Sequence, residues 1–222
     1  MEMRHQYNVS LQELSKSILQ MSSLAASAIQ KAVSAFLNAD EKLAAQVIQG
    51  DETIDQLEKS IEHQCLVLLL RQQPVASDLR KVSCAMKMIT DIERIGDAAE
   101  DIAELSRHMK GNRPEDLMDT IQKMSVCVKD MFEQVIEAYV NSDLESAKQV
   151  IAKDDIADQL FCDIRKQVVK EIVAQPEQAD SAMNCFMAAK YLERVGDHAV
   201  NIGEWVESVS YTHLTLPTIL RV

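Results

Sequence analysis

The sequence Glu-Arg-x-Gly-Asp occurs twice, 100 residues apart, and it carries most of the chemistry that this chain offers. The copies begin at Glu93 and Glu193 and end at Asp97 and Asp197. Acidic residues four positions apart lie on one face of a helix, where like charges repel and cost about 0.2–0.5 kcal/mol. The glycine within each motif costs about 1 kcal/mol relative to alanine. Because both costs occur in both copies, we expect something to offset them, and a bound cation is the simplest candidate.

Further acidic side chains lie at helical spacing around each copy of the motif. The first copy continues to Asp101, and the second has Asn201 in its place. Carboxylates from adjacent helices form an all-oxygen site, which suits hard cations as well as iron and manganese. A solvated acidic face is the usual meaning of such a stripe, but its repetition favours metal binding. The predicted ligands are Asp51, Asp55, Glu93, Asp97 and Asp101 in the first half, and Asp154, Asp158, Glu193, Asp197 and Asn201 in the second.

The motifs lie in a chain whose apolar residues recur at alternating spacings of four and three, which is typical of packed helices. One such seam begins at Tyr7, and from Leu14 onward a shift of 103 residues superimposes it on a second seam that begins at Leu117. Because the residue before proline leaves the α region, Pro74 and Pro176 end the second helix of each half. We therefore predict an all-α fold of six long helices, arranged as a tandem repeat of two antiparallel three-helix bundles.

The division between the halves is marked by a Gly-Asn-Arg-Pro sequence at residues 111–114, which combines a helix stop with a helix start. The first bundle is predicted to span residues 1–110 and the second residues 113–207. Residues 210–222 lose both the charge and the heptad pattern. We interpret them as an atypical tail of the kind that a cloning or assembly artefact produces.

Composition excludes several functional classes. A net charge of −12 and an aromatic content of 4% oppose binding to nucleic acid or to an anionic membrane surface. The longest apolar run has six residues, far short of the roughly 20 that a membrane-spanning helix needs. The N-terminus has no apolar core of a signal peptide. The five cysteines stand singly, so we expect free thiols and a soluble protein in the reducing cytoplasm.

No nucleophile with an adjacent base and no glycine-rich phosphate loop is found, so we do not expect an enzyme. A di-iron carboxylate oxidase would need Glu-x-x-His on two helices, and the only such pair is Glu2 with His5. A helical adaptor without metal is the other alternative. Arg94 and Arg194 either neutralise the carboxylates, contact a partner or form surface ion pairs. His198 is interpreted as a surface residue.

The doubled motif, together with the sequence from Pro74 to Arg80 and the Asp51-Glu52-x-x-Asp55 sequence, resembles the PhoU family of bacterial phosphate-uptake regulators. The resemblance covers residues 7–207, and the tail departs from it. It implies multinuclear metal clusters held by the motif carboxylates, with the metal open among Fe, Mn, Zn and Mg. It also implies a cytoplasmic homodimer that associates peripherally with the phosphate ABC transporter and the phosphate-sensing histidine kinase. Such an adaptor represses the phosphate regulon when phosphate is plentiful.

Overall fold

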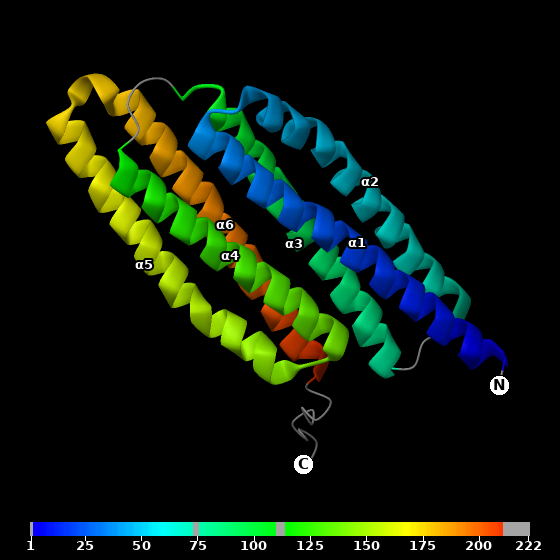
Figure 1. Cartoon of the computed structure of the whole chain (residues 1–222). Coiled ribbons are helices and arrows are strands. Elements are labelled where there is room, and N and C mark those ends of the chain that lie inside the picture. Colours follow the sequence, from blue (N-terminus) through cyan, green and yellow to red (C-terminus); the bar gives the residue numbers. More distant parts are fainter. Residues whose placement is uncertain (1, 73–75, 110–113, 211–222) are drawn as a thin grey trace, which may run out of the picture.

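A computed structural model describes residues 2–72, 76–109 and 114–210, and within these ranges it contains helices but no strand (Figure 1). The prediction of an all-α fold with six long helices is confirmed. Residues 211–222 of the predicted tail lie outside the described ranges. The elements are α1 (Glu2–Asn38), α2 (Glu41–Gln72), α3 (Ala76–Ser106), α4 (Glu115–Asn141), α5 (Leu144–Ala174), the 3-10 turn η1 (Pro176–Gln178) and α6 (Ala179–Ser210).

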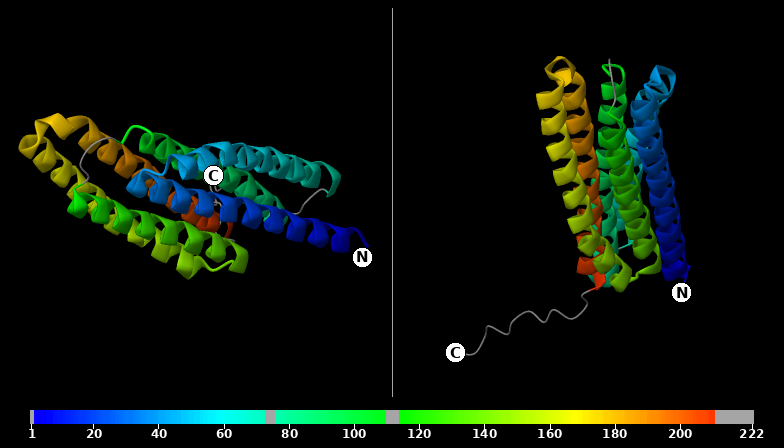
Figure 2. Two further views of the ribbon diagram at one scale, coloured as in Figure 1. Left: turned by 45° about the horizontal axis from the view of Figure 1, so that its top comes forward. Right: turned by 60° about the vertical axis from the view of Figure 1, so that its left-hand side comes forward.

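The helices form two groups of three that share a contact surface. α1, α2 and α3 pack against one another, as do α4, α5 and α6. In addition α3 packs against α6 and α1 against α4, which leaves α2 and α5 at opposite edges of the molecule (Figure 2). Buried apolar residues of both groups belong to one hydrophobic core. The expected boundary near residues 111–114 falls almost wholly outside the described residues, so the division into 1–110 and 113–207 stays a prediction.

The four-three seams supply this core. Ile18 and Met21 of α1 and Met124 and Val128 of α4 have no exposed surface at all. Fully burying a side chain of this size stabilises the fold by about 1.5–3 kcal/mol relative to leaving it exposed. Apolar stripes of this kind fix which face of each helix turns inward, and therefore which face carries the acidic residues outward.

Matched N-caps start the second helix of each group. Asp40 Oδ1 accepts from the backbone N–H groups two and three residues ahead, at 3.1 and 3.0 Å. Asp143 Oδ1 does the same at 3.1 and 3.2 Å. The preceding residues, Ala39 and Ser142, have positive φ angles of 47° and 53°, which turns the chain tightly before each cap. Each cap is worth about 1 kcal/mol, and together they fix where α2 and α5 begin relative to the acidic positions.

Candidate metal centre

The first acidic cluster lies where α2 faces α3. Asp51 and Asp55 of α2 and Asp97 of α3 each offer a carboxylate oxygen, and these oxygens all lie within 4.8 Å of one another. Oxygens that share a cation at roughly 2.0–2.6 Å are themselves about 3–5 Å apart, so small side-chain rotations would bring all three onto one ion. Glu93 and Asp101 lie one turn before and after Asp97 on α3. The structure therefore brings together three of the predicted ligands, with the other two of the first half flanking them.

Gly96 allows the close approach of α2 and α3 at this cluster. A Cβ atom at this position would lie 3.0 Å from Asp51 Oδ1 and 3.1 Å from Ile54 Cδ1, closer than most real Cβ atoms approach a neighbour. The equivalent Gly196 is less crowded, since a Cβ there would lie 3.5 Å from Asp154 Oδ1. The absence of a side chain at Gly96 thus leaves room for the Asp51 carboxylate against α3.

The electrostatics of the first cluster favour a bound positive charge. Burial raises the pKa of Asp51 to about 6, and the negative charges of Asp55 and Asp97 add to this effect. Burial likewise raises the pKa of Glu93 to about 7, with Asp97 contributing and Arg94 opposing. Glu93 Oε2 is buried and accepts no hydrogen bond, although Arg94 Nε lies 3.3 Å away. These carboxylates fit a hard cation, because their ionised forms are costly without one.

The second acidic cluster lies where α5 faces α6. Burial raises the pKa of Asp154, and the negative charges of Asp158, Asp197, Asp155 and Glu193 raise it further, so these acids lie near Asp154. Within the described part of the second half, however, no three of them converge as closely as the triad of the first half. Lys190 also forms an ion pair with Glu193. The second cluster is therefore looser and already contains a basic group.

The motif arginines have different surroundings. Arg94 pairs with both acids of its own motif, through Nη1 to Asp97 at 2.8 Å and through Nε to Glu93 at 3.3 Å. Arg194 instead approaches Asp101 of α3, at 3.9 Å. Arg94 therefore partly neutralises the first cluster, while Arg194 links the two groups of helices.

A buried polar network at the α3–α6 contact was not predicted. Asp91 is 9% exposed, and it accepts hydrogen bonds from Asn201 Nδ2 at 3.2 Å and Trp205 Nε1 at 3.0 Å. His198 Nδ1 lies 2.9 Å from Asp91 Oδ1. The interpretation of His198 as a surface residue is wrong, because its side chain is only 19% exposed and lies against α3. Asn201, a predicted metal ligand, directs its amide nitrogen into this network.

The sequence carried one weak signal for this network. Three residues with polar hydrogens follow one another at spacings of three and four on α6, namely His198, Asn201 and Trp205. That spacing places them on one helix face, where a single buried acceptor satisfies all three. Their acceptor, Asp91, has Tyr191 as its counterpart in the second half, so comparison of the repeats did not single it out.

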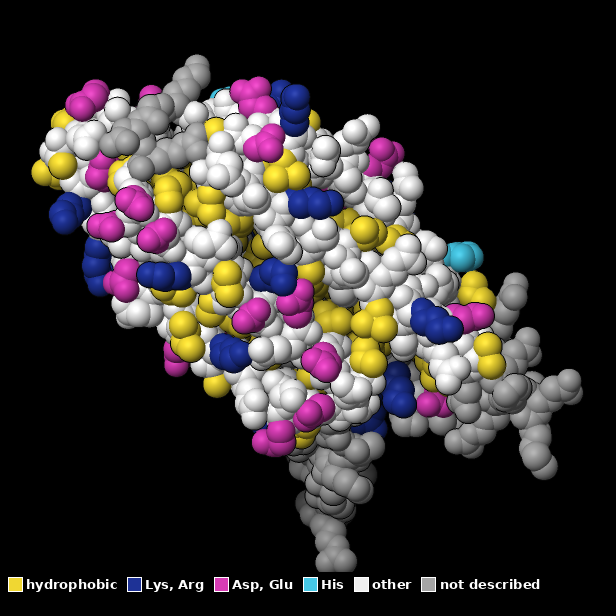
Figure 3. Space-filling view, in the orientation of Figure 1, with side chains coloured by type: hydrophobic (Ala, Val, Ile, Leu, Met, Phe, Trp, Pro, Cys, Tyr) yellow, Lys and Arg dark blue, Asp and Glu magenta, His cyan; other side chains and the backbone are white. Residues whose placement is uncertain are grey.

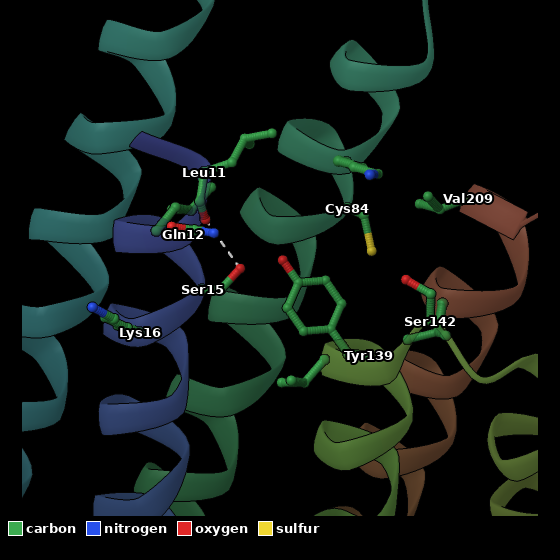
Figure 4. A pocket seen from close by; sticks show the side chains of 12 residues that line it. Leu11, Gln12, Ser15, Lys16, Cys84, Tyr139, Ser142 and Val209 are labelled. Atoms are coloured by element: carbon green, nitrogen blue, oxygen red, sulfur yellow. Dashed lines mark hydrogen bonds between the residues drawn. The ribbon is translucent and has the colours of Figure 1, made fainter. Parts of the chain in front are cut away.

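A separate cavity of about 550 Å³ opens between α1, α3, α4 and α6. In Figure 4 the Tyr139 hydroxyl points toward Ser15 of α1, and the Cys84 thiol lies on the opposite wall near Val209. Burial raises the pKa of Tyr139. None of the predicted metal ligands lines this cavity, so it is distinct from both acidic clusters.

The five cysteines are all free thiols, as expected.

Two further observations bear on the functional class. None of the described helices has an apolar stretch of the length and hydropathy that crossing a membrane requires. The side chains of the one Glu-x-x-His pair, Glu2 and His5, lie outside the described residues. Paired three-helix units with a group of carboxylates at each outer helix define a helical repeat protein with an acidic cluster in each half.

Comparison with known proteins identifies the family. The model of the PhoU domain matches the chain twice, over residues 18–106 and 121–206. The chain belongs to the PhoU family. It is 34% identical over 195 residues to the phosphate-specific transport system accessory protein PhoU homolog of Clostridium acetobutylicum, covering 87% of this chain and 89% of that protein. It is 27% identical over 201 residues to the PhoU accessory protein of Escherichia coli, covering 90% and 83%.

Solved structures agree with this assignment. The crystal structure of PhoU from Pseudomonas aeruginosa superimposes with a TM-score of 0.89 at 30% sequence identity, covering 93% of this chain and all of that one. The phosphate transport system regulatory protein PhoU from Streptococcus pneumoniae gives a TM-score of 0.87 at 26% identity. These relatives are named as accessory or regulatory proteins of phosphate transport rather than as enzymes. The predicted PhoU-like fold is therefore confirmed.

Proposed function

We propose that this chain is a metal-binding cytoplasmic regulator of phosphate uptake, which acts by docking onto other proteins. Its relatives are accessory proteins of the phosphate-specific transport system, and this supports a role beside the transporter. The observation that carries the metal component is the convergence of Asp51, Asp55 and Asp97 within 4.8 Å. In this role the protein represses the phosphate regulon when phosphate is plentiful.

The metal would be held by the first cluster, with Asp51, Asp55 and Asp97 as the nearest ligands and Glu93 and Asp101 at its edges. A bound Fe, Mn, Zn or Mg ion supplies positive charge to carboxylates that burial makes costly to ionise. Carboxylates that bridge two ions would also accommodate a multinuclear cluster. In this proposal the ion serves structure and docking rather than catalysis.

Docking surfaces are available on the outer helices. Leu66 and Leu70 of α2 are 43% and 81% exposed, and Val169 and Val173, which follow them by 103 residues, are 58% and 76% exposed. Exposed apolar side chains at matching positions suit contacts with a second copy or with partner proteins. We propose a homodimer that engages the cytoplasmic subunit of the phosphate ABC transporter and the phosphate-sensing histidine kinase.

The charge of the chain suits such partners. Its net charge is −12, but the face in Figure 3 interleaves acidic with basic side chains, so the negative excess is not concentrated there. Charge complementarity with a basic patch steers the encounter more than it sets the affinity. Association with the partners should therefore slow as the salt concentration rises.

A reporter for phosphate-starvation genes tests this function in a deletion strain. Deletion should leave the reporter active in phosphate-rich medium, and residues 1–207 should restore repression. Asp97→Asn should restore it poorly, whereas Asp163→Asn, at an exposed acid that pairs with Lys166, should restore it fully. Repression that survives the deletion, or a pulldown that recovers neither transporter nor kinase from phosphate-replete cells, would contradict the adaptor role.

One observation favours a metal-free adaptor as the alternative. Arg94 pairs with both Glu93 and Asp97 and so already supplies one counter-charge to the first cluster. Metal analysis of the purified protein separates the two functions. A protein without bound metal that still restores repression after the Asp97→Asn change would support the alternative.

A further inference from the structure

The two acidic clusters have the same centre but different surroundings. Four central carboxylates occur in both clusters, related by a shift of 103 residues on α2 and of 100 residues on α3. They are Asp51, Asp55, Glu93 and Asp97 in the first cluster and, in the same order, Asp154, Asp158, Glu193 and Asp197 in the second. The surrounding residues do not match, and the second half has fewer acids and more bases. The first half has Glu58, Glu62, Thr90, Glu100 and Asp101 where the second has, in the same order, Phe161, Arg165, Lys190, Val200 and Asn201.

One of these pairs of positions makes the same contact in both halves with different chemistry. Thr90 Oγ1 donates to Glu58 Oε1 at 3.3 Å in the first half. In the second half, Lys190 Nζ lies 5.5 Å from the centroid of the Phe161 ring and forms an ion pair with Glu193. The face of an aromatic ring attracts an ammonium group. Phe161 and Glu193 therefore hold a positive charge at the edge of the second cluster, where the first half has a hydroxyl and a carboxylate.

Each cluster contains a basic partner, but the partners differ. Arg94 pairs with Glu93 and Asp97 in the first cluster. In the second cluster Lys190 pairs with Glu193, while Arg194 turns toward Asp101 of the first half. In the described residues, close convergence of three carboxylate oxygens is also confined to the first cluster. A cation gains less in the second cluster, because it meets fewer acidic side chains there and, among the described residues, no set of three converging oxygens, and because Lys190 adds a like charge next to Glu193.

We propose that Lys190 is a built-in counterion of the second cluster and that it confines metal binding to the first. Its ammonium group supplies the charge that a metal ion supplies between α2 and α3. Lys190 thereby determines which of the two clusters binds a metal ion, although both clusters contain the same four central carboxylates. The part of this proposal that concerns metal rests on the proposed function.

Titration of the metal-free protein with MnCl₂, followed by calorimetry and thermal unfolding, tests the proposal. Asp97→Asn should remove the Mn²⁺ response, whereas Asp197→Asn should leave it intact. In the Asp97→Asn background, Lys190→Thr should restore binding by relieving repulsion, improving affinity at least about tenfold. A control, Lys166→Thr, removes a lysine that pairs with Asp163 on the same outer region of the second half and should restore nothing.

The reciprocal change keeps the test decisive if one variant does not fold. Thr90→Lys introduces the second-half residue into the first cluster and should weaken Mn²⁺ binding at least about tenfold, while Thr90→Ser should keep it. An Mn²⁺ response that survives Asp97→Asn and vanishes with Asp197→Asn would overturn the proposal. Failure of Thr90→Lys to weaken binding would overturn it as well.

A measurement without metal separates this inference from the proposed function. If Lys190 is a counterion, Lys190→Thr should lower the Tm of the metal-free protein at low salt by up to about 2–4 °C. The loss should shrink at high salt, because salt screens the repulsion among the remaining carboxylates. A wild-type protein that ignores every metal would refute the metal-binding function. An unchanged metal-free Tm at low salt would refute the counterion role of Lys190.

Discussion

Alanine at the two motif glycines should have opposite effects on stability. Replacing glycine with alanine in a helix interior stabilises it by about 1 kcal/mol when the new methyl group has room. At Gly196 the nearest atoms to an added Cβ are 3.5 Å away, which is ordinary contact, so Gly196→Ala should raise the free energy of unfolding by about 0.5–1 kcal/mol. Gly196→Ala is thus a control within the same chain for the substitution at the more crowded Gly96.

At Gly96 the same methyl group would lie 3.0 Å from Asp51 Oδ1, 3.1 Å from Ile54 Cδ1 and 3.3 Å from Ile54 Cγ2. Overpacking of this kind costs about 1–3 kcal/mol, which cancels or exceeds the helix-propensity gain. Gly96→Ala should therefore lower the free energy of unfolding by about 0–2 kcal/mol. The two variants should differ by about 1–3 kcal/mol in urea denaturation of the metal-free protein, with an unchanged m-value.

The same substitution should also affect the metal cluster. Asp51 Oδ1 is the atom nearest the added methyl group, so we expect the methyl group to displace Asp51 from its place in the triad with Asp55 and Asp97. Mn²⁺ affinity should therefore fall in Gly96→Ala and stay unchanged in Gly196→Ala. Equal stabilisation by both substitutions would refute the idea that Gly96 is required for the close approach of α2 and α3.

Three further predictions follow from the site. In metal-free protein the folded state binds protons more tightly than the unfolded state, because the pKa values of Asp51 and Glu93 are raised to about 6 and 7. Stability should therefore fall as the pH rises from about 4 to about 7, and Asp51→Asn should flatten the curve of Tm against pH. Chelation should lower the Tm of metal-loaded protein at neutral pH, and Asp97→Asn should abolish this sensitivity. Asp91→Ala orphans three donors and should cost about 2–4 kcal/mol in urea denaturation, against about 1 kcal/mol for Trp205→Phe; equal costs would contradict a shared acceptor.

The fold could be predicted from the sequence because its signals are local and occur twice. The apolar seams determine which face of each helix is buried, as Ile18 and Met124 show by their complete burial. Asp40 and Asp143 fix the starts of α2 and α5 through hydrogen bonds to residues only two and three positions away. Interactions of such short range depend on spacing alone, so the pattern determines them without knowledge of the partner helices.

The candidate site was predictable only in part. Helical spacing aligned Glu93, Asp97 and Asp101 on α3, and the repeat identified Asp51 and Asp55 as their partners on α2. Which oxygens converge depends on how closely α2 and α3 approach, and at Gly96 that approach leaves little room for a side chain. The sequence therefore predicted the participants of the first cluster, but the looseness of the second required the structure.

Repeat comparison fails at the contact between the halves for a physical reason. Within each half, equivalent residues lie at equivalent places in the bundle, so a shift of 100 or 103 residues transfers an inference about position from one half to the other. Where α3 packs against α6, each residue contacts the other half of the chain. A substitution in either helix therefore changes the surroundings of residues in both halves. Asp91 needs the donors of His198 and Trp205, 107 and 114 residues away, and no residue in its own half. A specific contact between two copies of one unit is therefore encoded by the positions at which the copies differ.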